Sequence, residues 1–126
     1  MTVLHQPATT GDVLKYELNP NFNRETVTLL AGASYPVGAV LGRITASGLY
    51  KLATSGGSDG AQTAAAVLLT AGDASAADTP GLVVARGPAI VSKAALVFDA
   101  TVDDAAKTAT KHGQLAALGI VPRDTA

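Results

Sequence analysis

Only a few residues of this sequence have the types and the spacing that chemistry requires. Residues 56–60 read G-G-S-D-G and contain the G-x-S-x-G pattern, in which a serine on a sharp strand-to-helix turn acts as a nucleophile. That geometry requires a buried strand before the serine, whereas residues 53–56 are small and polar. The two histidines, His5 and His112, fall in an N-terminal segment without periodicity and in a late helical segment. We therefore interpret residues 56–60 as a flexible loop that ends in an Asp-Gly turn.

The sequence predicts no metal site and no cofactor. It contains no cysteine, which excludes disulfides and thiolate metal ligands. Asp99, Asp103 and Asp104 are close in the sequence, but acidic residues at this position are typical of a loop followed by a helix start. No P-loop, H-E-x-x-H or calcium-loop pattern occurs.

Length and charge limit the class of protein. A chain of 126 residues is expected to form one domain. Nine Lys and Arg residues against ten Asp and Glu give a net charge of -1, which argues against a nucleic-acid surface. The longest apolar stretch, residues 89–98, contains Ser92 and Lys93 and is far shorter than the roughly 20 apolar residues of a membrane helix. We therefore expect neither a nucleic acid nor a membrane as partner.

The low content of charged residues, 15%, together with many alanines and glycines, fits a surface that packs against copies of itself or a partner. A GC-rich genome would produce the same composition. The composition therefore leaves both explanations open.

The middle of the chain predicts a series of short strands. Residues 26–30 are apolar and β-branched, and residues 40–45 can alternate between two faces. Ala46-Ser47-Gly48 fits a three-residue hairpin loop with Gly48 at positive φ. Gly42 lies within a strand, where a missing side chain permits a bend or a close backbone contact. Further strands are expected from about residue 64 to 70, at residues 82–85 and at residues 89–91.

One helix is predicted, within residues 102–119. Asp103 and Asp104 suit a helix N-terminus, and alanines follow. Gly113 costs about 1 kcal/mol relative to alanine inside a helix. A helix that begins near Thr110 is therefore the alternative.

The end of this helix is better marked. Gly119 fits the left-handed position after the last turn, and Ile120 can pack back on Leu115. Pro122 then suits an edge strand, because it cannot donate a ladder hydrogen bond. These elements together predict a small, mostly β domain with one short C-terminal helix.

The N-terminal residues differ in character from the rest. Residues 1–13 show no periodicity and are either a frayed terminus or an arm that orders on a partner by adding a strand or docking in a groove. Residues 14–18 alternate and predict a short strand, and residues 19–21 predict a turn. Phe22 is expected to be a core anchor, with an interface role as the minority interpretation. Arg24 is expected to form an exposed ion pair with the glutamate that follows it.

An ordered series of segments resembles a known family. The segments are T-V-T-L at residues 26–29, Gly32, G-A-V-L-G-R-I-T at residues 38–45, G-L-Y at residues 48–50, D-G-A-Q-T-A-A-A-V-L at residues 59–68, V-V-A-R-G at residues 83–87 and L-A-A-L-G-I-V at residues 115–121. In this order the chain resembles the bacteriophage lambda head decoration protein D family over most of residues 14–123.

This resemblance implies a fold and a function. The implied fold is a small β-clip-like barrel with a flexible N-terminal arm. Residues 1–24 would be the capsid-binding arm and linker, and residues 25–126 the β-rich decoration domain. The implied function is that of a late, non-enzymatic virion protein, present in the host cytoplasm before assembly. Homotrimers would bind the major capsid protein at three-fold sites outside the expanded head and hold it against packaged DNA.

The expected capsid-binding residues lie in the arm and the segment after it. They are Thr2, Val3, Leu4, His5, Gln6, Pro7, Leu14, Tyr16, Phe22 and Arg24. Two alternatives remain open. A trimeric clip-fold nucleotide hydrolase similar to dUTPase would need an acidic residue and a tyrosine in a glycine-rich motif, and Tyr50 follows Gly48 without that acidic residue. An adhesion module would instead bind cells or glycans.

Overall fold

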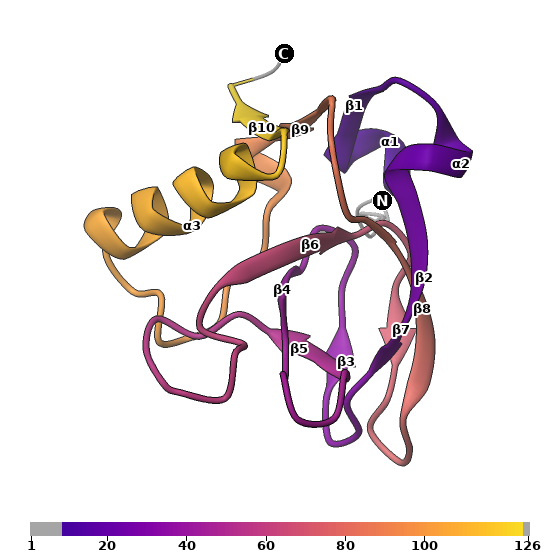
Figure 1. The fold of residues 1–126 in the computed structure, drawn as a ribbon, viewed down its shortest axis with the longest axis vertical. Coiled ribbons are helices and arrows are strands. Elements are labelled where there is room, and N and C mark those ends of the chain that lie inside the picture. The colour runs from indigo at the N-terminus through magenta and orange to yellow at the C-terminus, as the bar shows by residue number, and fades with distance from the viewer. Residues whose placement is uncertain (1–8, 125–126) are drawn as a thin grey trace, which may run out of the picture.

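The computed structural model describes residues 9–124 and contains three β-sheets and one longer helix (Figure 1). Its helical elements are α1 (Thr10–Val13), α2 (Pro20–Asn23), the 3-10 turn η1 (Lys93–Ala95) and α3 (Ala105–Ala117). Its strands are β1 (Leu14–Glu17), β2 (Arg24–Leu29), β3 (Ser34–Tyr35), β4 (Val40–Arg43), β5 (Tyr50–Leu52), β6 (Ala64–Leu68), β7 (Gly72–Asp73), β8 (Thr79–Val84), β9 (Ala89–Ser92) and β10 (Ile120–Arg123). The predicted mostly β fold with a C-terminal helix is confirmed.

Five strands close into a barrel in the order β2-β5-β4-β6-β8. The strand β2 pairs antiparallel with β8 along its whole length, and the barrel closes through a single parallel pair between Leu29 and Tyr50. Since β8 pairs with all six residues of β2, it begins at Thr79, three residues before residue 82, where the sequence predicts its start.

A second sheet has the order β1-β9-β10, and β3 pairs with β7 in a third. Figure 1 shows β1, β9 and β10 together at one end of the barrel, and α3 contacts both β6 and β10. The three-stranded sheet and the helix therefore cover the barrel from outside.

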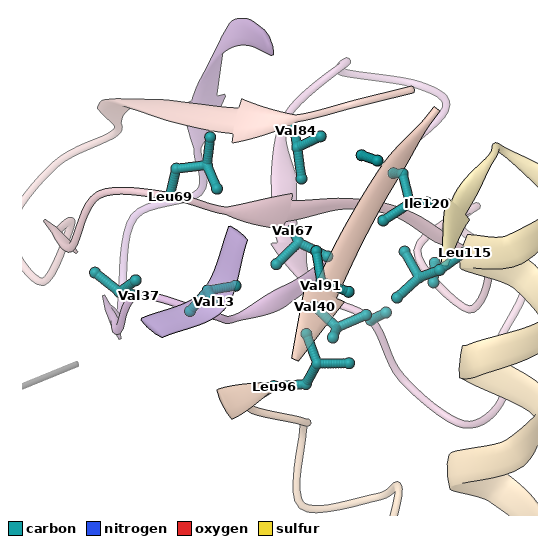
Figure 2. Packing of buried hydrophobic residues seen from close by; sticks show 13 residues of the cluster. Val13, Val37, Val40, Val67, Leu69, Val84, Val91, Leu96, Leu115 and Ile120 are labelled. Atoms are coloured by element: carbon teal, nitrogen blue, oxygen red, sulfur yellow. The ribbon is translucent and has the colours of Figure 1, made fainter. Parts of the chain in front are cut away.

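Neighbouring residues of the barrel strands point to opposite faces, and both faces are buried. One core lies inside the barrel and contains Leu29, Leu41, Ala66, Leu68 and Val83. The other lies between the barrel and its cover and contains Val40, Val67, Val84, Val91, Leu115 and Ile120 (Figure 2). This explains why β4, β6 and β8 read as nearly continuous apolar runs.

Gly42 and Gly48 occupy the positions predicted for them from the sequence. A Cβ on Gly42 would collide with the backbone of Ala61, so only glycine permits this close approach. The pairing of β4 with β6 also shifts register at Gly42. Gly48 has φ of 75° in the hairpin loop between β4 and β5. Both predictions are confirmed.

The helix α3 begins at Ala105, so the alternative start near Thr110 is wrong. The Asp104 carboxylate accepts the N–H of Lys107 at 2.8 Å and caps the first turn. Gly113 lies on the exposed face of the helix, where its cost is too small to stop the helix.

The end of α3 matches the prediction. Gly119 has φ of 83°, and Ile120 and Leu115 belong to the same buried cluster (Figure 2). The strand β10 then forms an edge of its sheet, parallel to β9, which accommodates Pro122.

The expectation that Phe22 is a core residue is wrong. The structure leaves 52% of Phe22 exposed. Residues 20–23 form the short helix α2, started by the Asn19 side chain, which accepts the N–H of Asn21 at 2.8 Å. On this helix the buried side chain is Asn23, whose amide donates to the carbonyls of Arg86 and Pro88. Asn23 therefore anchors α2, and Phe22 turns away from the core.

Candidate interaction surface

The G-x-S-x-G segment is an exposed loop between β5 and β6, as interpreted from the sequence. The Asp59 carboxylate forms an ion pair with the Lys51 ammonium at 2.8 Å and accepts the N–H of Ala61 at 3.0 Å. The hydrogen bond from Lys51 is the main cause that lowers the pKa of Asp59. The aspartate therefore fixes the end of a loop, and among residues 9–124 it orients no histidine toward Ser58.

The remaining candidate chemical groups have structural roles. The imidazole of His112 packs against Phe98 with ring centroids 5.8 Å apart, and burial is the main cause that lowers its pKa. The carboxylate of Asp99 accepts hydrogen bonds within its own turn, and Asp103 pairs with Lys107. Within residues 9–124 no group of histidine, aspartate and glutamate side chains is arranged to hold a metal ion. His5 lies outside the described residues.

The predicted capsid-binding residues other than Arg24 fall into three groups. Residues 2–7 lie outside the described residues. Leu14 is partly buried against the core that lies between the barrel and its cover, so its side chain holds β1 in place. Tyr16 and Phe22 are exposed, by 48% and 52%. Among the described members of the set, these two present large apolar side chains to solvent.

Arg24 forms an ion pair with Glu17, and the expected pair with Glu25 is wrong. The Arg24 guanidinium donates to both Glu17 carboxylate oxygens, at 2.7 to 3.1 Å. Successive residues of a strand point to opposite faces, so Arg24 and Glu25 cannot meet. The helix α2 reverses the chain and brings the end of β1 beside the start of β2.

The second sheet carries a row of apolar residues on its outer side. Tyr16 of β1 and Val121 of β10 both pair with Ile90 of β9, and directly paired residues lie on the same face of a sheet. Their neighbours along the strands, Ala89 and Ile120, point to the buried core. Tyr16, Ile90 and Val121 therefore form one row across the outside of the sheet.

Leu18 extends this row. Its side chain is 60% exposed, and its N–H donates to the carbonyl of Pro88 just beyond β9 at 3.3 Å. Leu18 directly follows the end of β1 at a bend, two residues after Tyr16, and continues the exposed apolar segment beyond the strand. We call Tyr16, Leu18, Ile90 and Val121 the outer face.

A rim of polar contacts borders the outer face at α2. The Arg86 guanidinium donates to the carbonyl of Phe22 at 2.6 Å and to Glu25 at 3.2 Å. Its central carbon lies 5.8 Å from the centroid of the Phe22 ring, within the range of a cation–π contact. Phe22 is therefore held in place although it is exposed.

Sequence reasoning did not place Leu18, Ile90 and Val121 in the site. The alternation of residues 14–18 is a signal that groups Leu18 with Tyr16. Ile90 and Val121 carry no such signal, because the parallel pairing of β10 with β9 joins segments far apart in the chain.

Among residues 9–124 no helix is both long and apolar enough to cross a membrane.

Comparison with known families decides the class of protein. The family described as bacteriophage lambda head decoration protein D matches residues 3–120 of the 126-residue chain. The chain belongs to this family. The resemblance noted in the sequence is thereby confirmed, and the match spans the barrel, β1, β9 and α3 and ends at Ile120, the first residue of β10. Curated proteins gave no match. Membership identifies a phage head decoration protein, a structural component of the phage capsid.

Proposed function

We propose that this decoration protein binds the outside of the expanded phage head as trimers at three-fold sites and stabilises the shell against packaged DNA. The family match over residues 3–120 carries the proposal. Its partners are the major capsid protein and two further copies of itself. The protein acts by binding, without catalysis, and is present in the host cytoplasm before it joins the head.

The capsid-binding part is proposed to be residues 1–24, with residues 25–126 as the decoration domain. Thr2, Val3, Leu4, His5, Gln6 and Pro7 form the arm. Tyr16 and Phe22 continue the contact on the folded body, and the Arg24–Glu17 pair shapes the turn between them. The pairing of β1 with β9 supports this arrangement, because it fixes the base of the arm to the folded body.

Preference for the expanded shell is the physical basis of stabilisation. A ligand shifts a two-state equilibrium only by its difference in affinity for the two states. A decoration protein that binds the expanded shell more tightly therefore opposes its collapse. Because a shell offers many identical sites, modest contacts at each site add to a large total.

Co-sedimentation with DNA-free shells tests the proposal. The full chain and a chain lacking residues 1–8 are each mixed with expanded and unexpanded shells. The cut falls at residue 8 because the Thr9 N–H donates to Asp12 at 2.8 Å and Val13 is fully buried, so a longer deletion would damage the fold.

We expect the full chain to pellet with expanded shells at saturation and the shortened chain to bind more weakly. Equal binding of both chains would retain the decoration function and remove the arm from it. If the full chain fails to pellet with expanded shells, the proposed function is wrong.

A further inference from the structure

The loop between β5 and β6 contains the one Asp-Gly pair of the sequence, Asp59-Gly60, and no Asn-Gly pair occurs in the chain. A peptide chain isomerises most readily where aspartate precedes glycine, because the attacking backbone nitrogen then has no side chain beside it to hinder the reaction. The proposed function makes no use of this pair. Its surroundings nevertheless control its chemistry closely.

The fold requires a glycine at position 60. Gly60 has φ of 103°, a conformation that residues with a side chain rarely adopt. A Cβ at this position would collide with the side chain of Thr45 and would lie 2.7 Å from the carbonyl oxygen of Arg43. The fold therefore cannot remove the reactive pair by replacing its glycine.

Isomerisation begins with attack of the Gly60 nitrogen on the side-chain carbonyl carbon of Asp59. The new N–Cγ bond forms as the Cγ–OH bond breaks, and the hydroxyl group leaves with the amide proton as one molecule of water. A second water molecule then opens the resulting succinimide at either ring carbonyl, which yields aspartate or isoaspartate. In isoaspartate the main chain runs through Cγ, so the loop is one atom longer.

The peptide group that must attack is held on both sides. The N–H of Gly60 donates to the side-chain oxygen of Gln62 at 2.8 Å. The carbonyl oxygen of Asp59 accepts the N–H of Thr45, also at 2.8 Å. Rotation of this peptide group toward the Asp59 side chain would break both hydrogen bonds.

The carboxyl group that would be attacked is held as well. The Asp59 carboxylate accepts the N–H of Ala61 at 3.0 Å and pairs with the Lys51 ammonium at 2.8 Å through its other oxygen. Ring closure needs a protonated carboxyl group, because the departing oxygen leaves as water. The neighbouring ammonium favours the ionised carboxylate, which cannot react in this way.

We propose that Asp59 is a site of spontaneous isoaspartate formation in this protein, and that Lys51 and Gln62 suppress the reaction in the folded state. Lys51 keeps the carboxylate ionised, and Gln62 keeps the attacking N–H engaged. This role is independent of capsid binding. Isoaspartate at this position would break the hydrogen bond to Ala61, the residue whose backbone packs against Gly42 of β4.

Ageing of the purified full chain at neutral pH tests the inference. Isoaspartate is quantified by enzymatic methylation with an isoaspartyl methyltransferase and is located by electron-transfer fragmentation in a mass spectrometer. Lys51→Gln removes the ion pair, and Gln62→Ala frees the N–H of Gly60. Lys107→Gln is the matched control, because it removes an ion pair of the same length, 2.8 Å, between α3 and Asp103. Circular dichroism checks the fold of each variant.

Asp73 provides a reference within the same chain. Its carboxylate accepts the N–H of Ser75 at 3.1 Å in a similar turn, but an alanine follows it and it forms no ion pair within residues 9–124. A general loosening of the fold would raise isoaspartate at Asp73 as well as at Asp59.

We expect isoaspartate at residue 59 to form about threefold faster in Lys51→Gln and in Gln62→Ala than in the wild type, the scale of one exposed ion pair or hydrogen bond. The rate at Asp73, and the rate at Asp59 in Lys107→Gln, should stay at the wild-type value. Unfolding the wild type in urea should raise the rate at Asp59 by more than about tenfold.

Three results would overturn the inference. Wild-type rates at residue 59 in both loop variants would show that Lys51 and Gln62 do not suppress the reaction. An equal rise at Asp73 would identify general loosening of the fold as the cause. Equal rates in the folded and unfolded wild type would show that the fold gives no protection. Because no shell is present in these measurements, each result leaves the proposed function untouched.

Discussion

The attachment of α3 can be tested with one substitution, Leu115→Ala. Only Leu115 and Lys111 are buried on this helix, so Leu115 is its one fully buried apolar side chain. Leu115 is fully buried with Ile120 and Val91 (Figure 2). Loss of this contact loosens both α3 and the base of β10, which carries Val121 of the outer face.

The expected loss of stability follows from the burial. Replacing leucine by alanine removes three carbons, which corresponds to about 2.4 kcal/mol at roughly 0.8 kcal/mol per buried carbon. The remaining cavity adds to this, so we expect the free energy of unfolding to fall by about 3 kcal/mol. For a domain of this size the melting temperature should fall by about 10 °C.

Urea unfolding followed by circular dichroism measures the effect, with a shift in midpoint at unchanged slope. The matched control is Leu118→Ala, which removes the same carbons from a side chain that is exposed at the end of the helix. We expect the control to lose less than about 1 kcal/mol. A loss under about 1 kcal/mol in Leu115→Ala, or equal losses in both variants, would refute this account of how α3 is held.

Three further predictions concern single residues. The Lys111 ammonium is buried without a carboxylate partner among the described residues, and burial lowers its pKa. The unfolded chain then binds its proton more tightly, so the free energy of unfolding of the wild type should rise, relative to Lys111→Met, as the pH increases toward the ordinary lysine pKa of about 10.4. Equal pH slopes in urea unfolding would contradict this. Gly42→Ala should lower the free energy of unfolding by about 2 kcal/mol, because the new Cβ meets the Ala61 backbone. Gly113→Ala, on the exposed face of the helix, should raise it by up to about 1 kcal/mol. A higher melting temperature for Gly42→Ala than for Gly113→Ala would refute the packing argument. Asp104→Ala should lower the free energy of unfolding by about 1 kcal/mol, because it removes the hydrogen bond that caps α3. An unchanged melting temperature would show that the cap contributes nothing to stability.

Local patterns predicted the strands and the helix end because those features depend on neighbouring residues. The alternation around Val40 and Leu41, the turn at Gly48 and the helix end at Gly119 all appear in the structure where the sequence indicates them. The helix start is harder to predict, because the sequence does not show that Gly113 faces solvent. The direction in which a helical residue points decides that cost.

The candidate surface was predictable only in part. Tyr16 and Phe22 are both among the capsid-binding residues expected from the sequence, although Phe22 is also expected there to be a core anchor. Phe22 is exposed because the side chain that anchors α2 is the polar Asn23, and Arg24 pairs with Glu17 because the chain reverses at α2. A buried asparagine leaves no signal in a hydrophobic pattern. The row from Tyr16 through Ile90 to Val121 requires the long-range pairing of three strands, which no local pattern encodes.

The most direct test of the central claim is a cryo-electron microscopy map of expanded shells saturated with the full chain, compared with a map of undecorated shells. The account predicts difference density for three copies at each three-fold site on the outer surface, with the end formed by β1, β9 and β10 facing the shell. Absence of added density from the outer surface would contradict the decoration function. Density at another symmetry position would contradict the trimer at three-fold sites.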